Sequence, residues 1–262
     1  MVANNRLYII LGYHPSNFPF QIVFQINYDP KFKPEALFIE GDHVALFGTA
    51  TDGSSVFTQV YIYSVALNRG FPVEIANYKF EGSYFDGRKT NDGWVYLLTT
   101  MNLRPILTPW YNVNGIRTHV NFGSMFIYRG DNVQFPTYLN VISFDLRNVH
   151  HSRTKMVCLI TEAAHKIYMT YAHIYLMVEK DQGGQLVTIV HKVFVWRWFI
   201  VPFADITLPG VVNNQFNLDE FNGYILRVVT TSFSGGQSVI NVYTMGYWLQ
   251  ALGAETGLLP GS

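Results

Sequence analysis

A seven-residue pattern, Asn91-Asp92-Gly93-Trp94-Val95-Tyr96-Leu97, places a polar turn directly before a run of apolar and aromatic residues. Asn, Asp and Gly favour turns, whereas Trp, Val and Tyr favour strands, so the pattern predicts a turn followed by a strand. It returns four times, with Leu7, Val44, Ile174 and Tyr224 in its fourth position. Helical periodicity is almost absent elsewhere. The chain is therefore predicted to be all-β and built from repeated units.

The repeats continue in a common order after the last four patterns. A longer apolar strand follows each pattern, and a shorter one comes next, as Val56–Val65 and Glu74–Phe80 do after the pattern at Val44. Four strands in about 40 to 50 residues is the period of a propeller blade. We predict a β-propeller of about four four-stranded blades, preceded by a strand pair at Leu7–Tyr13 and Gln21–Asn27.

The expected number of blades bears on assembly. Four blades close a ring only in the smallest propellers, and an open arc exposes strand edges that a partner must cover. We therefore expect residues 1–262 to form a single domain that is an incomplete or partner-completed ring. Three possibilities follow: the chain is a fragment, pairs with a second chain, or associates with itself. A protein partner or self-association is expected in either of the last two cases.

A long insertion, Asn102–Pro136, separates two of the repeats. A loop of this length inside a domain is uncommon and often functional. Arginine together with aromatic residues is typical of recognition surfaces, which makes Trp110, Tyr111 and Arg117 candidate binding residues. Alternatively, the aromatic side chains hold the loop against the blades, with a small hairpin at Phe122–Tyr128.

The composition excludes several classes of protein. Charged residues make up 14% of the chain, with 18 basic and 18 acidic residues, against roughly 25% in ordinary domains. High apolar content without net charge excludes disorder, and the zero balance argues against nucleic-acid binding. Cys158 alone cannot form a disulfide framework. No apolar run reaches the length of about 20 residues that a transmembrane helix needs.

No motif for catalysis, for a metal or for a cofactor occurs. The chain lacks Gly-x-Ser-x-Gly and both glycine-rich phosphate loops, so we expect no catalytic residues, no metal and no cofactor. His43 and His173 stand at the same position of two repeats, which indicates a structural role. Asp219–Gly223 is interpreted as a tight hairpin turn. The aromatic run Phe194–Phe199 is interpreted as a strand that fills space between blades, with a sugar-stacking platform as the alternative.

Four charged residues are further candidates for binding: Asp86, Arg88, Asp219 and Glu220. Propellers commonly bind ligands near the axis, where loops from every blade converge. These side chains are expected either to line such a polar pocket or to join one blade to the next by hydrogen bonds.

One segment is specific enough to suggest a family. It is Val212-Asn213-Asn214-Gln215-Phe216-Asn217-Leu218-Asp219-Glu220-Phe221-Asn222-Gly223-Tyr224. It resembles the blade-opening motif of secreted β-propeller proteins of archaea and bacteria, which are distantly related to WD-type repeats. Glu35–Asp42, Phe80–Arg88 and the tail Leu249–Gly261 agree in order, and the tail resembles the turn before a further blade.

The resemblance implies an extracellular or cell-surface protein, and it carries no established activity, substrate or catalytic set. Family members are longer and begin with a secretion signal, which Met1–Arg6 does not resemble. We therefore expect a non-catalytic extracellular module that binds a ligand or partner through the propeller face and the inserted loop. The alternative is a secreted hydrolase of polysaccharides with axial carboxylates, which requires two carboxyl groups about 5–9.5 Å apart.

Overall fold

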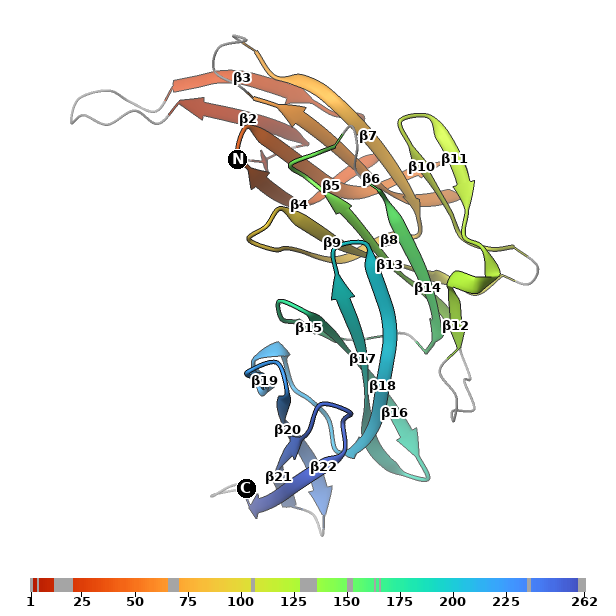
Figure 1. Ribbon diagram of the computed structural model, residues 1–262, viewed down its shortest axis with the longest axis vertical. Helices are drawn as coiled ribbons and strands as arrows, with labels where there is room; N and C mark the ends of the chain where they lie inside the picture. The colour runs from red at the N-terminus through yellow and green to blue at the C-terminus, as the bar shows by residue number, and fades with distance from the viewer. Residues whose placement is uncertain are drawn as a thin grey trace, which may run out of the picture. The chain divides into compact units, whose positions relative to one another are not determined.

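The computed structural model describes residues 2–3, 5–11, 21–65, 71–104, 107–127, 136–149, 153–162, 164, 166–234 and 237–258. The chain divides into two compact units, residues 1–125 with 138–159, and residues 126–137 with 160–262. Strands make up most of the described chain in both units (Figure 1).

The first unit begins with three antiparallel strands, β1 (Val2–Ala3), β2 (Arg6–Leu11) and β3 (Gln21–Asn27). The second sheet contains β4 (Phe32–Glu40), β5 (His43–Asp52), β6 (Ser55–Ser64) and β7 (Val73–Glu81), and is extended beyond β7 by β10 (Trp110–Val113) and β11 (Ile116–His119). The third has the order β12-β14-β13-β9-β8, with β8 (Ser83–Lys89), β9 (Trp94–Asn102), β12 (Met125–Ile127), β13 (Thr137–Asp145) and β14 (Lys155–Thr161).

The second unit contains two four-stranded sheets in sequential order. The first is formed by β15 (Lys166–Met169), β16 (His173–Gln182), β17 (Gln185–Trp196) and β18 (Phe199–Pro209). The second is formed by β19 (Leu218–Phe221), β20 (Ile225–Ser234), β21 (Gln237–Met245) and β22 (Ala251–Leu258). A short 3-10 turn, η3 (Gln215–Asn217), precedes β19.

The predicted repeat is confirmed by these sheets. Each of the five sequence patterns forms the second strand of its sheet, namely β2, β5, β9, β16 and β20, and its polar turn connects the first strand to the second. The second strand β9 is covered on both faces, because the side chains of Tyr96 and Leu97 point to opposite faces and are at most 2% exposed. Strands β5 and β16 are buried in the same way over most of their length, which explains why these strands read as continuous apolar runs. In β20 one face is partly open, since Arg227 is exposed. The described residues form four blades of four antiparallel strands, two of which carry added strands.

The structure extends two expectations about strands and corrects a third. The amino-terminal pair β2 and β3 is confirmed, and Val2–Ala3 adds a third strand beside β2; residues 12–13 of the predicted first strand lie outside the described residues. In the tail, Ala251–Leu258 pairs with β21 as the fourth strand of its sheet, and residues 259–261 of the expected turn lie outside the described residues. The aromatic run is a hairpin rather than one strand, and Arg197 adopts a φ of 56° in its turn. Trp196 and Trp198 are each more than a third exposed, so they do not fill the core.

Aromatic side chains form much of the first unit's core. Phe144 of β13 meets Phe47, Tyr78 and Phe80 of the neighbouring blade, with ring centroids 5.3–6.4 Å apart. All four rings are completely buried. Large rings fill the space between twisted sheets with few side chains, which accounts for the aromatic-rich composition.

The connection from one blade to the next repeats in detail. Gly82 and Gly210 have φ values of 99° and 87°. A Cβ at either glycine would lie 2.8 Å and 2.7 Å, respectively, from a backbone oxygen of the following blade. Thr58 and Thr188 occupy the same place beside them, and their hydroxyls donate to the glycine carbonyls at 3.0 Å and 2.8 Å. Only glycine satisfies both the positive φ and the close approach at these two positions.

Candidate functional site

The inserted segment forms a β-hairpin at the outer edge of a blade, beside β7 (Figure 1). Asn114 and Gly115 have φ values of 50° and 92°, as a two-residue type I′ turn requires. The backbone N–H of Asn77 donates to Asn114 Oδ1 at 3.0 Å, and that of Asn114 donates to the Asn77 carbonyl at 2.9 Å. The turn is thereby fixed to β7. The insertion is an extension of the sheet and not a structureless loop.

The hairpin expected at Phe122–Tyr128 is not formed by the described residues of that range. Phe122–Ser124 forms a 3-10 turn, η2, and Met125–Ile127 forms β12, which pairs with β14. Tyr128 lies outside the described residues. The turn chemistry of Asn114-Gly115 is the sequence signal that could have located the hairpin.

Trp110 and Tyr111 hold the hairpin from its two faces. Trp110 packs near Phe57, with ring centroids 6.3 Å apart, and its backbone N–H donates to Glu81 at 3.1 Å. Tyr111 stacks on the buried ring of Phe80, with centroids 6.5 Å apart. Their contacts agree with the alternative in which the aromatic residues hold the segment against the blade.

Arg117 lies on the exposed strand of the hairpin. Its guanidinium carbon is 4.2 Å from the centroid of the Trp110 ring, a cation–π contact that leaves the charge open to solvent. All four residues of β11 are exposed. No described carboxylate forms an ion pair with Arg117. Within the part of the chain that the structure describes, β11 is the last strand of its sheet, and one of its edges is unpaired.

A groove of about 600 Å³ lies at the same end of this blade. It is lined by Ser54, Ser55, Val56, Glu81, Gly82, Ser83, Thr100, Met101, Asn102 and Arg104. Arg104 of the inserted segment forms an ion pair with Glu81, which also accepts the backbone N–H of Trp110. The inserted segment thus forms one wall of the groove and joins it to the hairpin.

The second unit carries a groove at the equivalent connection, with a volume of about 470 Å³. It is lined by Gly184, Gln185, Leu186, Pro209, Gly210, Val211, Asn213, Thr231, Ser232 and Phe233, without a charged residue. The recurrence shows that the groove comes from the blade connection itself. The groove of the first unit differs from that of the second in containing the charged residues Glu81 and Arg104 and in adjoining the hairpin.

The four charged candidates fall into separate contacts. Arg88 pairs with Asp86 at 2.6 Å on β8, in the first unit. In the second unit, Asp219 and Glu220 are neighbours on β19 but have different surroundings: Asp219 is exposed and pairs with Arg227, whereas the Glu220 side chain is only 6% exposed. Neither groove is lined by these residues. The predicted axial pocket stays a prediction.

Glu220 belongs to a buried polar cluster between two blades of the second unit. It accepts hydrogen bonds from the Tyr175 hydroxyl and from His173 Nδ1, the latter at 2.8 Å. Burial alone raises the pKa of Glu220, but the bonds from His173 and Tyr175 outweigh it and hold that pKa below its usual value. Lys192 donates to the Tyr247 carbonyl at 2.9 Å and lies 4.3 Å from the Tyr247 ring centroid. Burial lowers the pKa of Lys192.

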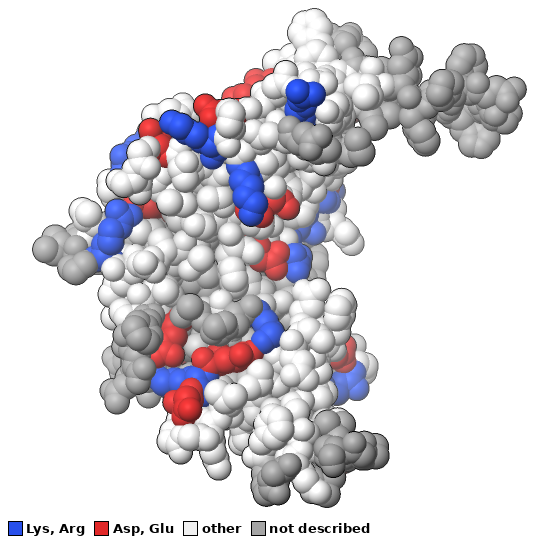
Figure 2. Space-filling model, turned by 180° about the vertical axis from the view of Figure 1, so that it is seen from behind, with Lys and Arg blue, Asp and Glu red and all other residues white. Residues whose placement is uncertain are grey.

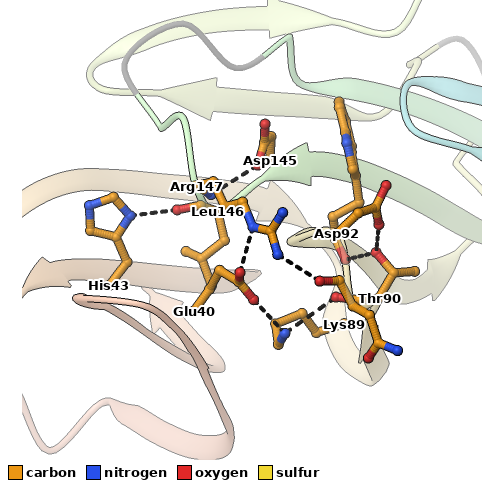
Figure 3. Close-up of polar contacts among 10 residues, drawn as sticks. Glu40, His43, Lys89, Thr90, Asp92, Asp145, Leu146 and Arg147 are labelled. Atoms are coloured by element: carbon orange, nitrogen blue, oxygen red, sulfur yellow. Dashed lines mark hydrogen bonds and ion pairs between the residues drawn. The ribbon is translucent and has the colours of Figure 1, made fainter.

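The first unit has a corresponding network between its blades (Figure 3). Glu40 accepts from Lys89 at 2.6 Å and from Arg147 at 2.5 Å, and these hydrogen bonds hold the pKa of Glu40 below its usual value. His43 Nδ1 lies 2.6 Å from the Leu146 carbonyl oxygen. His43 and His173 therefore both connect adjacent blades, and the structural role predicted for them is confirmed. Of the turn predicted over Asp219–Gly223, Asn222 and Gly223 form a hairpin turn with positive φ, whereas Asp219–Phe221 belong to strand β19.

Sequence reasoning missed Glu40, Arg147, Tyr175 and Lys192 as members of these clusters. Lys192 offered a usable sequence signal, because it is the single lysine of the largely apolar strand β17. In the structure it is only 1% exposed. The other three look like ordinary surface or strand residues, and their partners lie between 45 and 107 positions away.

The described residues hold neither a metal-binding cluster nor a membrane-spanning helix. No group of three or more His, Cys, Asp or Glu side chains is placed to hold a metal ion. No helix in the described ranges has the length and apolar character needed to cross a membrane.

Comparison with known proteins agrees with the architecture. Curated proteins give no match. The family model described as the β-propeller domain matches residues 1–262. The four antiparallel blades and this match over the whole sequence together show that the chain belongs to the β-propeller domain family.

Proposed function

We propose that the chain is a non-catalytic binding module and that strand β11 of the inserted hairpin is its contact surface. The observation that carries this proposal is the exposed edge of β11, with which no described strand pairs and which is added to a blade that already has four strands. Exposed edges invite pairing with other chains, and proteins usually cover or avoid them. An extra strand that creates such an edge supports a role in binding.

The surroundings of the hairpin support the same role. Trp110 and Tyr111 are packed inward, and the Asn114 turn is hydrogen-bonded to β7. The edge is therefore held rigidly, and little conformational entropy is lost when a partner binds. On the face drawn in Figure 2, basic and acidic side chains of the described residues lie in small mixed groups on an otherwise uncharged surface.

The contacts of the candidate carboxylates favour binding over hydrolysis. Asp86 and Asp219 each pair with an arginine, and Glu220 is buried under His173 and Tyr175. A glycosidase needs two carboxyl groups open to the substrate and about 5–9.5 Å apart. Hydrolysis of polysaccharides is therefore the second candidate.

The test combines a binding screen with a turnover assay. The purified chain is screened against an array of polysaccharides and of acidic, basic and neutral peptides, and release of sugar reducing ends is measured on the same polysaccharides. A triple variant, Ile116→Ser with Arg117→Ser and Thr118→Ser, replaces three of the four β11 side chains by serine. Gln185→Ser with Leu186→Ser, in an exposed hairpin of the second unit, is the control.

We expect at least one array member to bind the native chain and the control variant but not the triple variant, without cleavage. Binding that is unaffected by the triple variant would contradict the proposal. So would cleavage of a polysaccharide that is lost in Asp219→Asn or Asp86→Asn.

We also propose that the module works outside the cell or at its surface. The low charge and the resemblance to secreted propeller proteins support this. Fractionation of the producing cells, followed by detection with an antibody to the chain, is the measurement. Recovery of the protein only from the cytosol overturns this part of the proposal.

A further inference from the structure

We propose that β11 takes up an added β-strand from a partner protein, and that this strand alternates acidic and apolar residues. The inference rests on the proposed function and names the class of partner. Main-chain hydrogen bonds supply affinity when a strand is added to a sheet edge, and alternate side chains supply specificity.

The first argument is the direction of the backbone groups. The N–H of Val120 donates inward to the Pro109 carbonyl at 2.8 Å. Because the direction alternates along an antiparallel strand, Arg117 and His119 direct their N–H and C=O groups to the open edge. Among the described residues no strand pairs there. A partner strand would therefore pair directly with Arg117 and His119.

The second argument is the chemistry of the two faces. Arg117 and His119 lie on the face of Trp110, which is paired with His119 across the hairpin. Ile116 and Thr118 lie on the opposite face, and Ile116 is 74% exposed. In a strand paired with β11, two residues that are two positions apart would lie directly opposite Arg117 and His119. Their side chains would share the face of Arg117 and His119, because side chains alternate between faces with a period of two.

The third argument is charge complementarity. The nearby carboxylate of Glu81 is already paired with Arg104, and no described carboxylate pairs with Arg117. Asn112 of β10 is paired with Arg117 on one side and with Lys79 of β7 on the other. The side chains of Arg117 and Lys79 therefore lie on the same face of the sheet. Lys79 contacts the Phe57 ring and also forms no described ion pair. This face therefore favours acidic residues on the partner, and the Ile116 face favours apolar ones.

The probe is the peptide acetyl-Glu-Val-Glu-Val-Glu-Val-amide, titrated against the full chain by isothermal calorimetry and by amide hydrogen exchange. Three peptides serve as comparisons: one with Lys in place of Glu, one with the same residues in the order Glu-Glu-Glu-Val-Val-Val, and one with alternate backbone nitrogens methylated. We expect binding of the first peptide alone. The amides of Arg117 and His119 should gain protection, because they become hydrogen-bonded.

Two substitutions test the face directly. Arg117→Glu replaces an attraction by a repulsion and should weaken binding about tenfold, since 1.4 kcal/mol corresponds to a factor of ten. Lys31→Glu, the same charge reversal in an exposed turn of this unit, should change binding less than about twofold. Arg117→Pro also removes an edge N–H and should weaken binding more than Arg117→Ala. If Arg117→Pro does not fold, the methylated peptide tests the same hydrogen bonds.

Equal binding of the block-ordered or methylated peptide overturns strand addition, and equal binding of the lysine peptide overturns the acidic preference. Light scattering that shows dimers of the chain, lost in Arg117→Glu, identifies a second copy as the occupant and overturns the partner proposal. If the peptides fail but an array ligand still depends on β11, this inference fails while the proposed function stands.

Discussion

Each unit has a junction between neighbouring blades that is built around a carboxylate. The two junctions differ in which of the two blades supplies this carboxylate. In the first unit the acid, Glu40, belongs to the earlier blade and the later blade supplies Lys89 and Arg147. In the second unit the acid, Glu220, belongs to the later blade and the earlier blade supplies His173. Both junctions thus contain a polar contact, but they differ in which blade carries the negative charge.

The junctions also differ in exposure. The Arg147 side chain is 51% exposed and that of Glu40 is 14% exposed, whereas His173 and Glu220 are 4% and 6% exposed. Exposed ion pairs contribute little to stability, while removing one member of a buried pair leaves an uncompensated polar group. The two junctions should therefore respond differently to the same substitution.

The largest expected effect is the loss of Glu220. Glu220→Ala leaves His173 and Tyr175 buried without their acceptor, and it should lower the free energy of unfolding of the second unit by about 4 kcal/mol. Glu40→Ala, the matched change in the first unit, should cost about 1 kcal/mol. Hydrogen exchange of the β16 and β5 amides, measured in each variant, separates the two units. Equal losses in both variants would show that burial does not distinguish the junctions.

The next effect is a dependence on pH that belongs to the second unit. Burial lowers the pKa of His191 to about 4, from 6.5 in an unfolded chain. Between these values the unfolded chain binds the proton and the folded chain does not, so stability falls as the pH drops from 6.5 to 4, by about 3 kcal/mol in all. Glu40 and Glu220 have lowered pKa values, so their contributions are lost only at still lower pH. Urea unfolding at pH 7 and pH 4.5 measures the effect, and His191→Gln should remove most of it.

A smaller effect is expected at Lys192, beside Glu220. Its ammonium group is buried among the rings of Tyr175, Phe203 and Tyr247. Lys192→Met keeps the volume and removes the desolvated charge, so the free energy of unfolding should change by less than about 1 kcal/mol. Lys192→Ala leaves a cavity and should cost about 2 kcal/mol. A large loss in Lys192→Met alone would mean that the charge, and not the packing, holds this junction.

The smallest expected effect concerns salt. A double-mutant cycle between Glu40 and Arg147 should give a coupling of about 0.5 kcal/mol at low salt, and 1 M NaCl should nearly abolish it, because exposed charges are screened. The coupling between Glu220 and His173 should change little, since water and ions do not reach it. Equal salt dependence at both junctions would contradict their difference in exposure.

The repeat was readable from the sequence because each second strand has apolar and aromatic residues directly after a turn. Val95 and Leu97 sit in such a strand, and a polar turn precedes it; both signals are local. The first strand of each blade was missed, because strands such as β8 and β19 carry mixed burial patterns. The Asn114-Gly115 turn is a local signal that was overlooked, but the attachment of its hairpin to β7 could not be inferred, because β8 and β9 lie between β7 and the insertion.

The candidate site shows the same division. Arg117 was identified from the composition of the inserted segment, but the sequence could not show that Trp110 and Tyr111 face inward. Glu220 was identified as a charged residue near a turn, yet its bonds to His173 and Tyr175 depend on residues 47 and 45 positions away.

The sequence by itself determined the all-β class, the four blades and the polar turn before each second strand, because these depend on residues that are neighbours along the chain. Only the tertiary structure decided which charges are buried, which blade supplies the acid at each junction, and that no described strand pairs with the outer edge of β11. These properties depend on pairings between distant strands, and the free energy of a charge or of a backbone hydrogen bond is set by whether such a partner excludes water from it.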